Sequence, residues 1–203
     1  DPKYLDYYER TLFNQILGSR RAADSDVDPL VTYMLPVGPG VQRGFGNLGT
    51  CCGGTGLENH TKYQDSIYFA ATDESALYVN LYVPSTLTWA AKGVSVTQQT
   101  RMPLAGEATF TISGSATFDL KLRVPAWVRD GYTVTVNGAD QPVTATPGRP
   151  VTISRSWADG DTVTVRMPMR LHLERTVDDP TLQSLANGPV VLVARSGQGS
   201  YRK

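Results

Sequence analysis

Residues 117–124 have the sequence Thr-Phe-Asp-Leu-Lys-Leu-Arg-Val, in which every second side chain is apolar. Strict alternation of this kind is typical of a β-strand that buries one face. A similar period continues through most of the chain after Ser66. The other strand-like segments are 67–71, 77–83, 94–98, 108–112, 133–136, 151–154, 162–167, 171–174 and 190–194.

Turn signals separate these segments at short intervals. Val136-Asn137-Gly138 and Ala158-Asp159-Gly160-Asp161 are typical of hairpin turns. No helix-length pattern interrupts the strands, so the connections are too short for a parallel sheet. Beyond Ser66 the sequence therefore predicts an antiparallel β-sandwich, and a mainly β chain.

The start of the chain has a different period. In residues 2–17 apolar side chains recur at steps of three and four, and Gly18 follows where a helix would end. This predicts an amphipathic helix with a wide aromatic stripe. Few other helices are predicted to cover that stripe, so we expect the helix to favour self-association. Residues 30–35 predict a short extended segment, closed by Pro36.

The only two cysteines, Cys51 and Cys52, are adjacent in a glycine-rich stretch, which predicts a loop. A disulfide between neighbours would need a strained ring. The pair could instead hold a soft metal ion or provide a reactive thiolate. Free cysteines are also common as small buried hydrophobic residues, and spacing alone leaves these alternatives open.

A second, short helix is predicted at 57–65, with Thr55 as its N-cap and Glu58 completing a capping box. Glu58 is the carboxylate closest to the thiols, so it is a candidate for substrate binding or proton transfer as well as for capping. His60 is a second candidate for substrate binding and could also approach a metal ion held by the cysteines, although a surface or capping role is also common for such a histidine. Tyr33 is a candidate sugar-stacking residue, as are Tyr4 and Tyr7, and a core role would need the same spacing.

Two further residue types have structural interpretations. His172 alternates with leucines in a predicted strand and is expected on its solvent face. The three tryptophans, Trp89, Trp127 and Trp157, are expected to pack in the core or between domains, with a carbohydrate platform as the alternative.

Composition excludes some classes of function. Nineteen basic residues balance nineteen acidic residues in the 203-residue chain, so no overall field favours nucleic acid or an anionic membrane. The longest apolar runs, such as 190–194, are too short to span a bilayer. We therefore expect neither a nucleic-acid nor a membrane partner.

Several sequence motifs resemble those of glycoside hydrolase family 127, the β-L-arabinofuranosidases. They occur in the same order along nearly the whole chain. The motifs are YYERTLFNQIL at 7–17, TCC at 50–52, ALYVNLYVPS at 76–85, LRVPAW at 122–127, VTVNG at 134–138 and NGPVVL at 187–192.

The resemblance implies a domain organisation. Residues 1–66 would be the C-terminal remnant of an (α/α)6 catalytic barrel that carries the Cys-Cys motif. Residues 67–175 would form a β-sandwich domain, and residues 176–203 would begin a second one. The first helix would then be one of the last helices of the barrel.

The resemblance also implies a chemistry for the cysteine pair. In the family the first cysteine is the nucleophile of a retaining glycosidase, and both cysteines bind zinc. A glutamate and a third cysteine, from an upstream Glu-x-Cys motif, complete that site. For this sequence the resemblance implies that Cys51 is the nucleophile and a zinc ligand, and that Cys52 is a second zinc ligand. The substrate would be a carbohydrate with a non-reducing-end β-L-arabinofuranosyl or related residue.

The sequence departs from the family pattern in two ways. It contains no Glu-x-Cys motif and no identified acid/base glutamate, so we expect this polypeptide alone to bind zinc partially or not at all and to lack full activity. Gly53-Gly54-Thr55 also replaces the Pro-Pro-Asn of better-known members. Two other interpretations are a non-catalytic carbohydrate-binding or scaffolding sandwich, and a dithiol metal or redox site unrelated to sugars.

Overall fold

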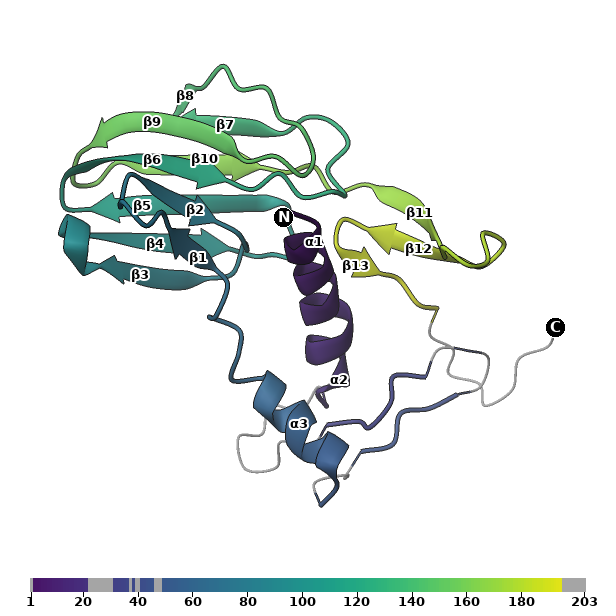
Figure 1. Cartoon of the computed structure of the whole chain (residues 1–203). Helices are drawn as coiled ribbons and strands as arrows, with labels where there is room; N and C mark the ends of the chain where they lie inside the picture. Colours follow the sequence, from purple (N-terminus) through teal and green to yellow (C-terminus); the bar gives the residue numbers. More distant parts are fainter. Residues whose placement is uncertain (1, 22–30, 37, 39–40, 46–48, 195–203) are drawn as a thin grey trace. The chain divides into compact units, whose positions relative to one another are not determined.

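The computed structural model describes residues 2–21, 31–36, 38, 41–45 and 49–194 (Figure 1). The chain divides into two compact units, each built from two separate stretches of sequence. The first unit comprises Asp1–Tyr7 and Gln64–Leu171, and the second comprises Tyr8–Tyr63 and His172–Lys203.

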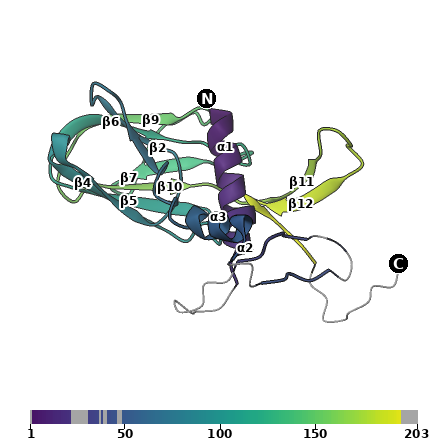
Figure 2. The ribbon, with the colours of Figure 1, turned by 60° about the horizontal axis from the view of Figure 1, so that its bottom comes forward.

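The first unit is a β-sandwich whose two sheets form separate layers (Figure 2). The four-stranded sheet has the order β1 (Tyr68–Ala70), β2 (Ala76–Val79), β6 (Ala116–Leu122), β9 (Val151–Trp157). The six-stranded sheet has the order β3 (Ser85–Trp89), β4 (Val94–Thr100), β5 (Glu107–Ser113), β10 (Thr162–Arg166), β7 (Thr133–Val136), β8 (Ala139–Asp140). A 3-10 turn, η2 (Ala90–Lys92), joins β3 to β4.

The alternating sequence of β6 explains how the layers pack. Phe118, Leu120 and Leu122 are buried, and the polar residues between them are more exposed. The ring of Phe118 contacts Trp89 of β3 in the other sheet, with ring centroids 5.2 Å apart. The predicted mainly β sandwich is therefore confirmed. All three tryptophans are buried, as expected of core residues.

The topology differs from a purely antiparallel sandwich at one position. β2 pairs with β6 in parallel, with Tyr78 opposite Lys121, whereas the other registered strand pairs are antiparallel. Three strands, β3, β8 and β12, were not predicted, because they are short or lack strict alternation.

The two predicted turns have different roles. Asn137 and Gly138 both have positive φ, 52° and 77°, and close the β7–β8 hairpin as predicted. The Ala158–Asp161 turn is tight, but it connects β9 of one sheet to β10 of the other, so its prediction as a hairpin was wrong. The Asp161 carboxylate accepts a hydrogen bond from Asn137 Nδ2 at 2.7 Å and thereby links the two turns.

The predicted first helix is present as α1 (Pro2–Thr11), a π-helical stretch η1 (Leu12–Ile16) and α2 (Leu17–Ser19). Within the second unit, Asn14 ties η1 to the strand β13 (Val190–Val191). Asn14 Nδ2 donates to the carbonyl oxygen of Pro189 at 2.8 Å, and Asn14 Oδ1 accepts from Val191 N at 2.7 Å. Tyr4 and Tyr7 are exposed, so the aromatic stripe does not serve as core here.

A three-stranded sheet consists of β11 (Leu171–Arg175), β12 (Gln183–Asn187) and β13, and all of it except Leu171 belongs to the second unit. In β11 the side chains that were predicted to face solvent and those predicted to face the interior are exchanged. His172 and Glu174 are on its more buried face and form an ion pair if the histidine is protonated, whereas Leu171 and Leu173 are exposed. The prediction of a solvent-facing His172 was therefore wrong, because the leucines do not face the protein interior. Among the described residues, no helix has the length and apolar character needed to cross a membrane.

Candidate functional site

The cysteines lie in the first turn of helix α3 (Cys51–Asn59), in the second unit. Thr50 is the N-cap, and its side-chain oxygen accepts a hydrogen bond from Gly53 N at 3.0 Å. Two predictions were therefore wrong: the pair is not in a loop, and Thr55 and Glu58 do not form a capping box. Three glycines in the segment obscured a helix that starts six residues before the predicted one.

Both thiols are free and exposed, which excludes the interpretation of the pair as buried hydrophobic residues. Their sulfur atoms lie 3.7 Å apart. The positive end of the α3 dipole is next to both sulfurs and favours negative charge there. The arrangement can therefore present two sulfurs to a metal ion, or one of them to an electrophile.

Tyr33 is positioned beside Cys52 through packing against α3. Its neighbour Val31 is only 1% exposed, and Val31 Cγ2 would lie 3.2 Å from a Cβ atom added at Gly56. The absence of a side chain at Gly56 thus allows this segment to approach α3. Tyr33 itself is 50% exposed. A hydrogen bond with Cys52, followed by the charge of Cys52, raises the pKa of the Tyr33 hydroxyl above its usual value.

His60 lies at the other end of α3, where it is the C-cap. Its Nδ1 atom hydrogen-bonds the Tyr63 hydroxyl, and its Nε2 atom is buried with no hydrogen-bond partner in the described part of the chain. Burial, and secondly the charge of Arg20, lowers the pKa of His60. The helix length places His60 roughly 12 Å along the axis from the cysteines, which is too far for a ligand of the same metal ion.

Glu58 is seven positions after Cys51 and so lies on the same side of α3, about 10 Å along the axis. Its side chain is exposed. The structure therefore brings Tyr33 to the cysteine pair, and places Glu58 and His60 further along the helix. Tyr63 and Arg20, the neighbours of His60, were not predicted; the three-residue spacing of His60 and Tyr63 is the only signal in the sequence.

The cysteine pair fits half of a tetrahedral zinc site. Two sulfurs bound at about 2.3 Å to one tetrahedral ion lie about 3.8 Å apart, and the observed separation is 3.7 Å. No group of three or more histidine, cysteine, aspartate or glutamate side chains suited to a metal occurs within the described ranges. The described residues thus offer two ligands out of the usual four.

Two family sequence profiles match the chain. The profile described as the β-L-arabinofuranosidase GH127 catalytic domain matches residues 1–65, which include the cysteine pair. The profile of the GH127 middle domain matches residues 76–169, which include most of the sandwich. No curated protein sequence matched the chain.

Solved structures match most of the chain. GH127 β-L-arabinofuranosidase Ara127N from Geobacillus stearothermophilus T6 has 27% sequence identity and a TM-score of 0.74, with 94% of this chain and 32% of that chain covered. A structure described as a glycoside hydrolase has 25% identity and a TM-score of 0.74, with 94% and 34% covered. A third structure is described as a GH127 β-arabinofuranosidase and has 24% identity and a TM-score of 0.75, with 94% of this chain and 33% of that chain covered. At this identity it supports the fold alone. The chain spans about a third of the length of these structures.

Proposed function

The chain belongs to glycoside hydrolase family 127, and we propose that it carries the nucleophile segment of a retaining glycosidase that removes β-L-arabinofuranosyl or related residues. The observation that carries this proposal is the exposed Cys51-Cys52 pair. It begins a helix within the segment that matches the catalytic-domain profile.

The proposed roles of the two sulfurs follow from the resemblance to the family, in which the first cysteine of the pair is the nucleophile and both cysteines bind zinc. Both sulfurs are exposed in this structure. Cys51 Sγ is the nucleophile in this proposal, and Cys52 is its partner in holding a metal ion.

The reaction has two steps. The Cys51 thiolate attacks the anomeric carbon, a C–S bond forms, the C–O bond to the leaving group breaks, and an acid protonates the leaving oxygen. Water then attacks the same carbon, the C–S bond breaks, and a base takes the proton of the water. Glu58 is two helical turns from Cys51, so neither proton transfer is assigned to it.

Zinc is the cofactor that the sulfur separation supports. Cys51 and Cys52 would hold it, and a bound zinc ion would keep both sulfurs as thiolates near neutral pH. Within the described residues, no third histidine, cysteine, aspartate or glutamate side chain lies close enough to form a metal site with the pair. The 203-residue polypeptide by itself is therefore expected to bind zinc weakly and to lack full activity.

The test uses a polypeptide that contains this chain together with the rest of the catalytic domain. Cys51→Ser is expected to lower turnover of an aryl β-L-arabinofuranoside by about 10³-fold or more, because the nucleophile is lost. Rapid quenching and peptide mapping of the unsubstituted protein should find the sugar on the peptide at Cys51. Cys52→Ser is the matched control, and sugar on Cys52 instead would overturn the assignment.

The 203-residue polypeptide provides a separate test. Zinc titration should give weak binding that Cys51→Ser and Cys52→Ser each reduce further. Stoichiometric, chelator-sensitive zinc in this polypeptide, with no reactivity toward arabinofuranosides in the longer protein, would favour a dithiol metal site unrelated to sugars. Rapid turnover of the aryl arabinofuranoside by this polypeptide alone would contradict the expectation that further groups are needed.

A further inference from the structure

A row of side chains crosses the outer face of the four-stranded sheet in the first unit. Phe69 of β1 is opposite Tyr78 of β2, and Tyr78 is opposite Lys121 of β6. Lys121 Nζ lies 5.7 Å from the centroid of the Tyr78 ring, and Phe69 is 49% exposed. The sheet thus presents two aromatic rings and an ammonium group on the side away from the sandwich core.

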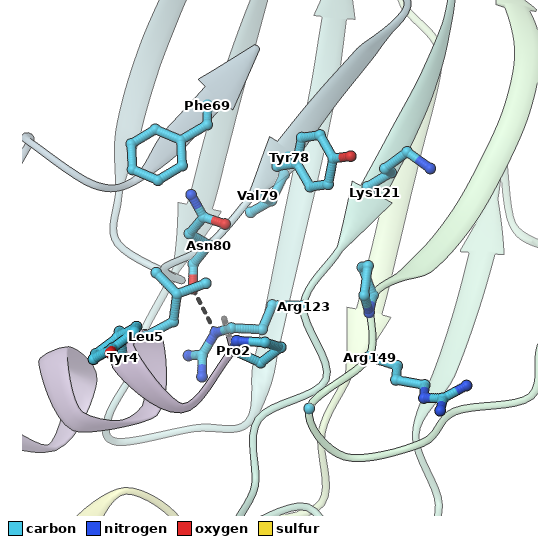
Figure 3. A pocket seen from close by; sticks show the side chains of 12 residues that line it. Pro2, Tyr4, Leu5, Phe69, Tyr78, Val79, Asn80, Lys121, Arg123 and Arg149 are labelled. Carbon is cyan, nitrogen blue, oxygen red and sulfur yellow. Dashed lines mark hydrogen bonds between the residues drawn. The ribbon is translucent and has the colours of Figure 1, made fainter. Parts of the chain in front are cut away.

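This row forms one wall of a pocket of about 390 Å³, and the first turns of α1 form another (Figure 3). Pro2, Tyr4 and Leu5 come from α1, and Gly148, Arg149 and Pro150 come from the segment before β9. All of these residues belong to the first unit. The pocket is therefore formed within one compact body, and the cysteine pair belongs to the other.

Asn80 gives the pocket an unused hydrogen-bond donor. Its side-chain amide lies between Phe69 and Leu5 (Figure 3). Asn80 is only 4% exposed, and its Nδ2 atom has no hydrogen-bond partner among the residues that the structure describes. A buried donor without a partner carries a free-energy cost. A ligand oxygen in the pocket would remove that cost.

The charge of the lining is positive. It includes Lys121, Arg123 and Arg149, and no aspartate or glutamate. Arg123 is paired with Asp6 at 2.8 Å, and Lys121 has Asp119 at 3.8 Å. Arg149 is exposed and makes no ion pair within the described ranges. The pocket therefore suits a ligand that brings its own negative charge.

We propose that this pocket is a second carbohydrate site, separate from the cysteine pair, that binds a uronic-acid residue of an acidic oligosaccharide. The C–H face of the sugar packs on Tyr78 and Phe69, as aromatic rings accommodate apolar faces. The carboxylate meets the Lys121 ammonium beside Tyr78, and a ring or hydroxyl oxygen accepts from Asn80 Nδ2. The choice of a sugar over another anion rests on the proposed function, whereas the pocket and its charge do not.

The test measures binding of an oligogalacturonate to the Cys51→Ser protein, so that catalysis plays no part. The fully methyl-esterified oligomer is the neutral comparison ligand. The acidic oligomer should bind about tenfold more tightly than the ester, because esterification removes the charge. Tyr78→Ala and Lys121→Met should each lower the affinity for the acidic oligomer by about tenfold.

Lys92→Met is the matched control for Lys121→Met. Lys92 Nζ also lies over an aromatic ring, that of Trp89 at 5.9 Å, but Lys92 does not line the pocket. Lys92→Met should therefore leave the affinity for the acidic oligomer unchanged. Asn80→Asp is nearly isosteric and should weaken binding through charge repulsion; a circular dichroism spectrum and melting curve would show whether it folds.

Three outcomes would overturn the proposal. The first is the absence of saturable binding, and the second is equal affinity for acid and ester. The third is equal competition by a short glutamate peptide, which would make the pocket a general anion site. If the sugar binds here but Cys51→Ser retains activity in the longer protein, the proposed function fails and the second site stands.

Discussion

Cys51 and Cys52 are adjacent in sequence but differ in their contacts. A hydrogen bond with Cys52, followed by the charge of Cys52, raises the pKa of the Tyr33 hydroxyl, and no such effect on Tyr33 comes from Cys51. The family motifs in the sequence led to the proposed chemistry of the pair, and the roles of nucleophile and zinc ligand stay predictions. The role of Tyr33 beside Cys52 depends on the packing of Val31 against Gly56, which no local pattern in the sequence reveals.

The ring and the hydroxyl of Tyr33 can be separated by substitution in the longer protein. We expect Tyr33→Phe to change KM for an aryl β-L-arabinofuranoside by about threefold or less, because the exposed ring remains available to the sugar. Tyr33→Ala should raise KM about tenfold through loss of aromatic contact. Equal effects of the two substitutions would show that the hydroxyl, and not the ring, carries the contribution.

His60 allows a test of local electrostatics. Because burial is the larger cause and the Arg20 charge the smaller, Arg20→Gln should raise the pKa of His60 only part of the way to the usual value of about 6.5. NMR titration of the two histidines, with His60→Gln to assign the signals, measures this. A His60 pKa at or above about 6.5 in the unsubstituted protein would contradict the structure.

The same shift has a consequence for stability. A histidine with a lowered folded-state pKa favours the neutral form in the folded protein. Its contribution is therefore fully present above the unfolded pKa of about 6.5 and is lost as the pH falls through the lower folded value. The free energy of unfolding of the second unit, measured with urea, should accordingly fall as the pH is lowered through that window. His60→Gln should reduce this pH dependence.

At the scale of the elements, α3 shows why a glycine-rich helix can be overlooked. Gly53, Gly54 and Gly56 lower its helix propensity, and Gly54 and Gly56 differ in their packing. Gly56 faces Val31, whereas a Cβ atom at Gly54 would meet nothing within 4 Å. The two positions therefore form a matched pair within one helix.

Gly54→Ala should stabilise α3 by about 1 kcal/mol, the usual difference between alanine and glycine in a helix. Gly56→Ala should give a smaller gain or a loss, because its Cβ atom would lie 3.2 Å from the buried, stiff side chain of Val31. Amide hydrogen exchange of α3 is the measurement. Equal gains would contradict the tight contact, and Val31→Ala should restore the gain at position 56.

Strands were more predictable than helix ends. The alternating segments of β4, β5, β6, β7 and β10 were found because their buried faces determine side-chain identity at every second position. β11 was found, but its faces were exchanged, since alternation does not say which face meets the protein. The parallel pairing of β2 with β6 depends on long-range topology and could not be predicted from local sequence.

At the scale of the whole molecule, the division into units does not follow the order of the chain. Each unit consists of two stretches that are separated in sequence by a stretch of the other unit. The first unit comprises Asp1–Tyr7 and Gln64–Leu171, and the second comprises Tyr8–Tyr63 and His172–Lys203. Sequence patterns describe contiguous stretches, so they could not predict this division. The self-association expected from the exposed Tyr4 and Tyr7 stays a prediction, which sedimentation at rising concentration would test.

The two units differ in their apolar cores, and we expect them to unfold separately. Among the described residues, the buried hydrophobic side chains of the second unit are Leu12, Val31 and Ala186, and all the others belong to the first. Burial of apolar surface is the main source of stability, so the second unit should open at lower urea concentration.

The chain contains the probes that this prediction needs. All three tryptophans lie in the first unit, so their fluorescence reports its unfolding, while hydrogen exchange of α3 amides reports the second unit. Leu12→Ala, at a cost of about 2–5 kcal/mol, should accelerate exchange in α3 and leave the fluorescence midpoint unchanged. Val96→Ala, in the buried face of β4, should lower the fluorescence midpoint instead. A single transition, shifted equally in both probes by either substitution, would show that the two units unfold as one cooperative body.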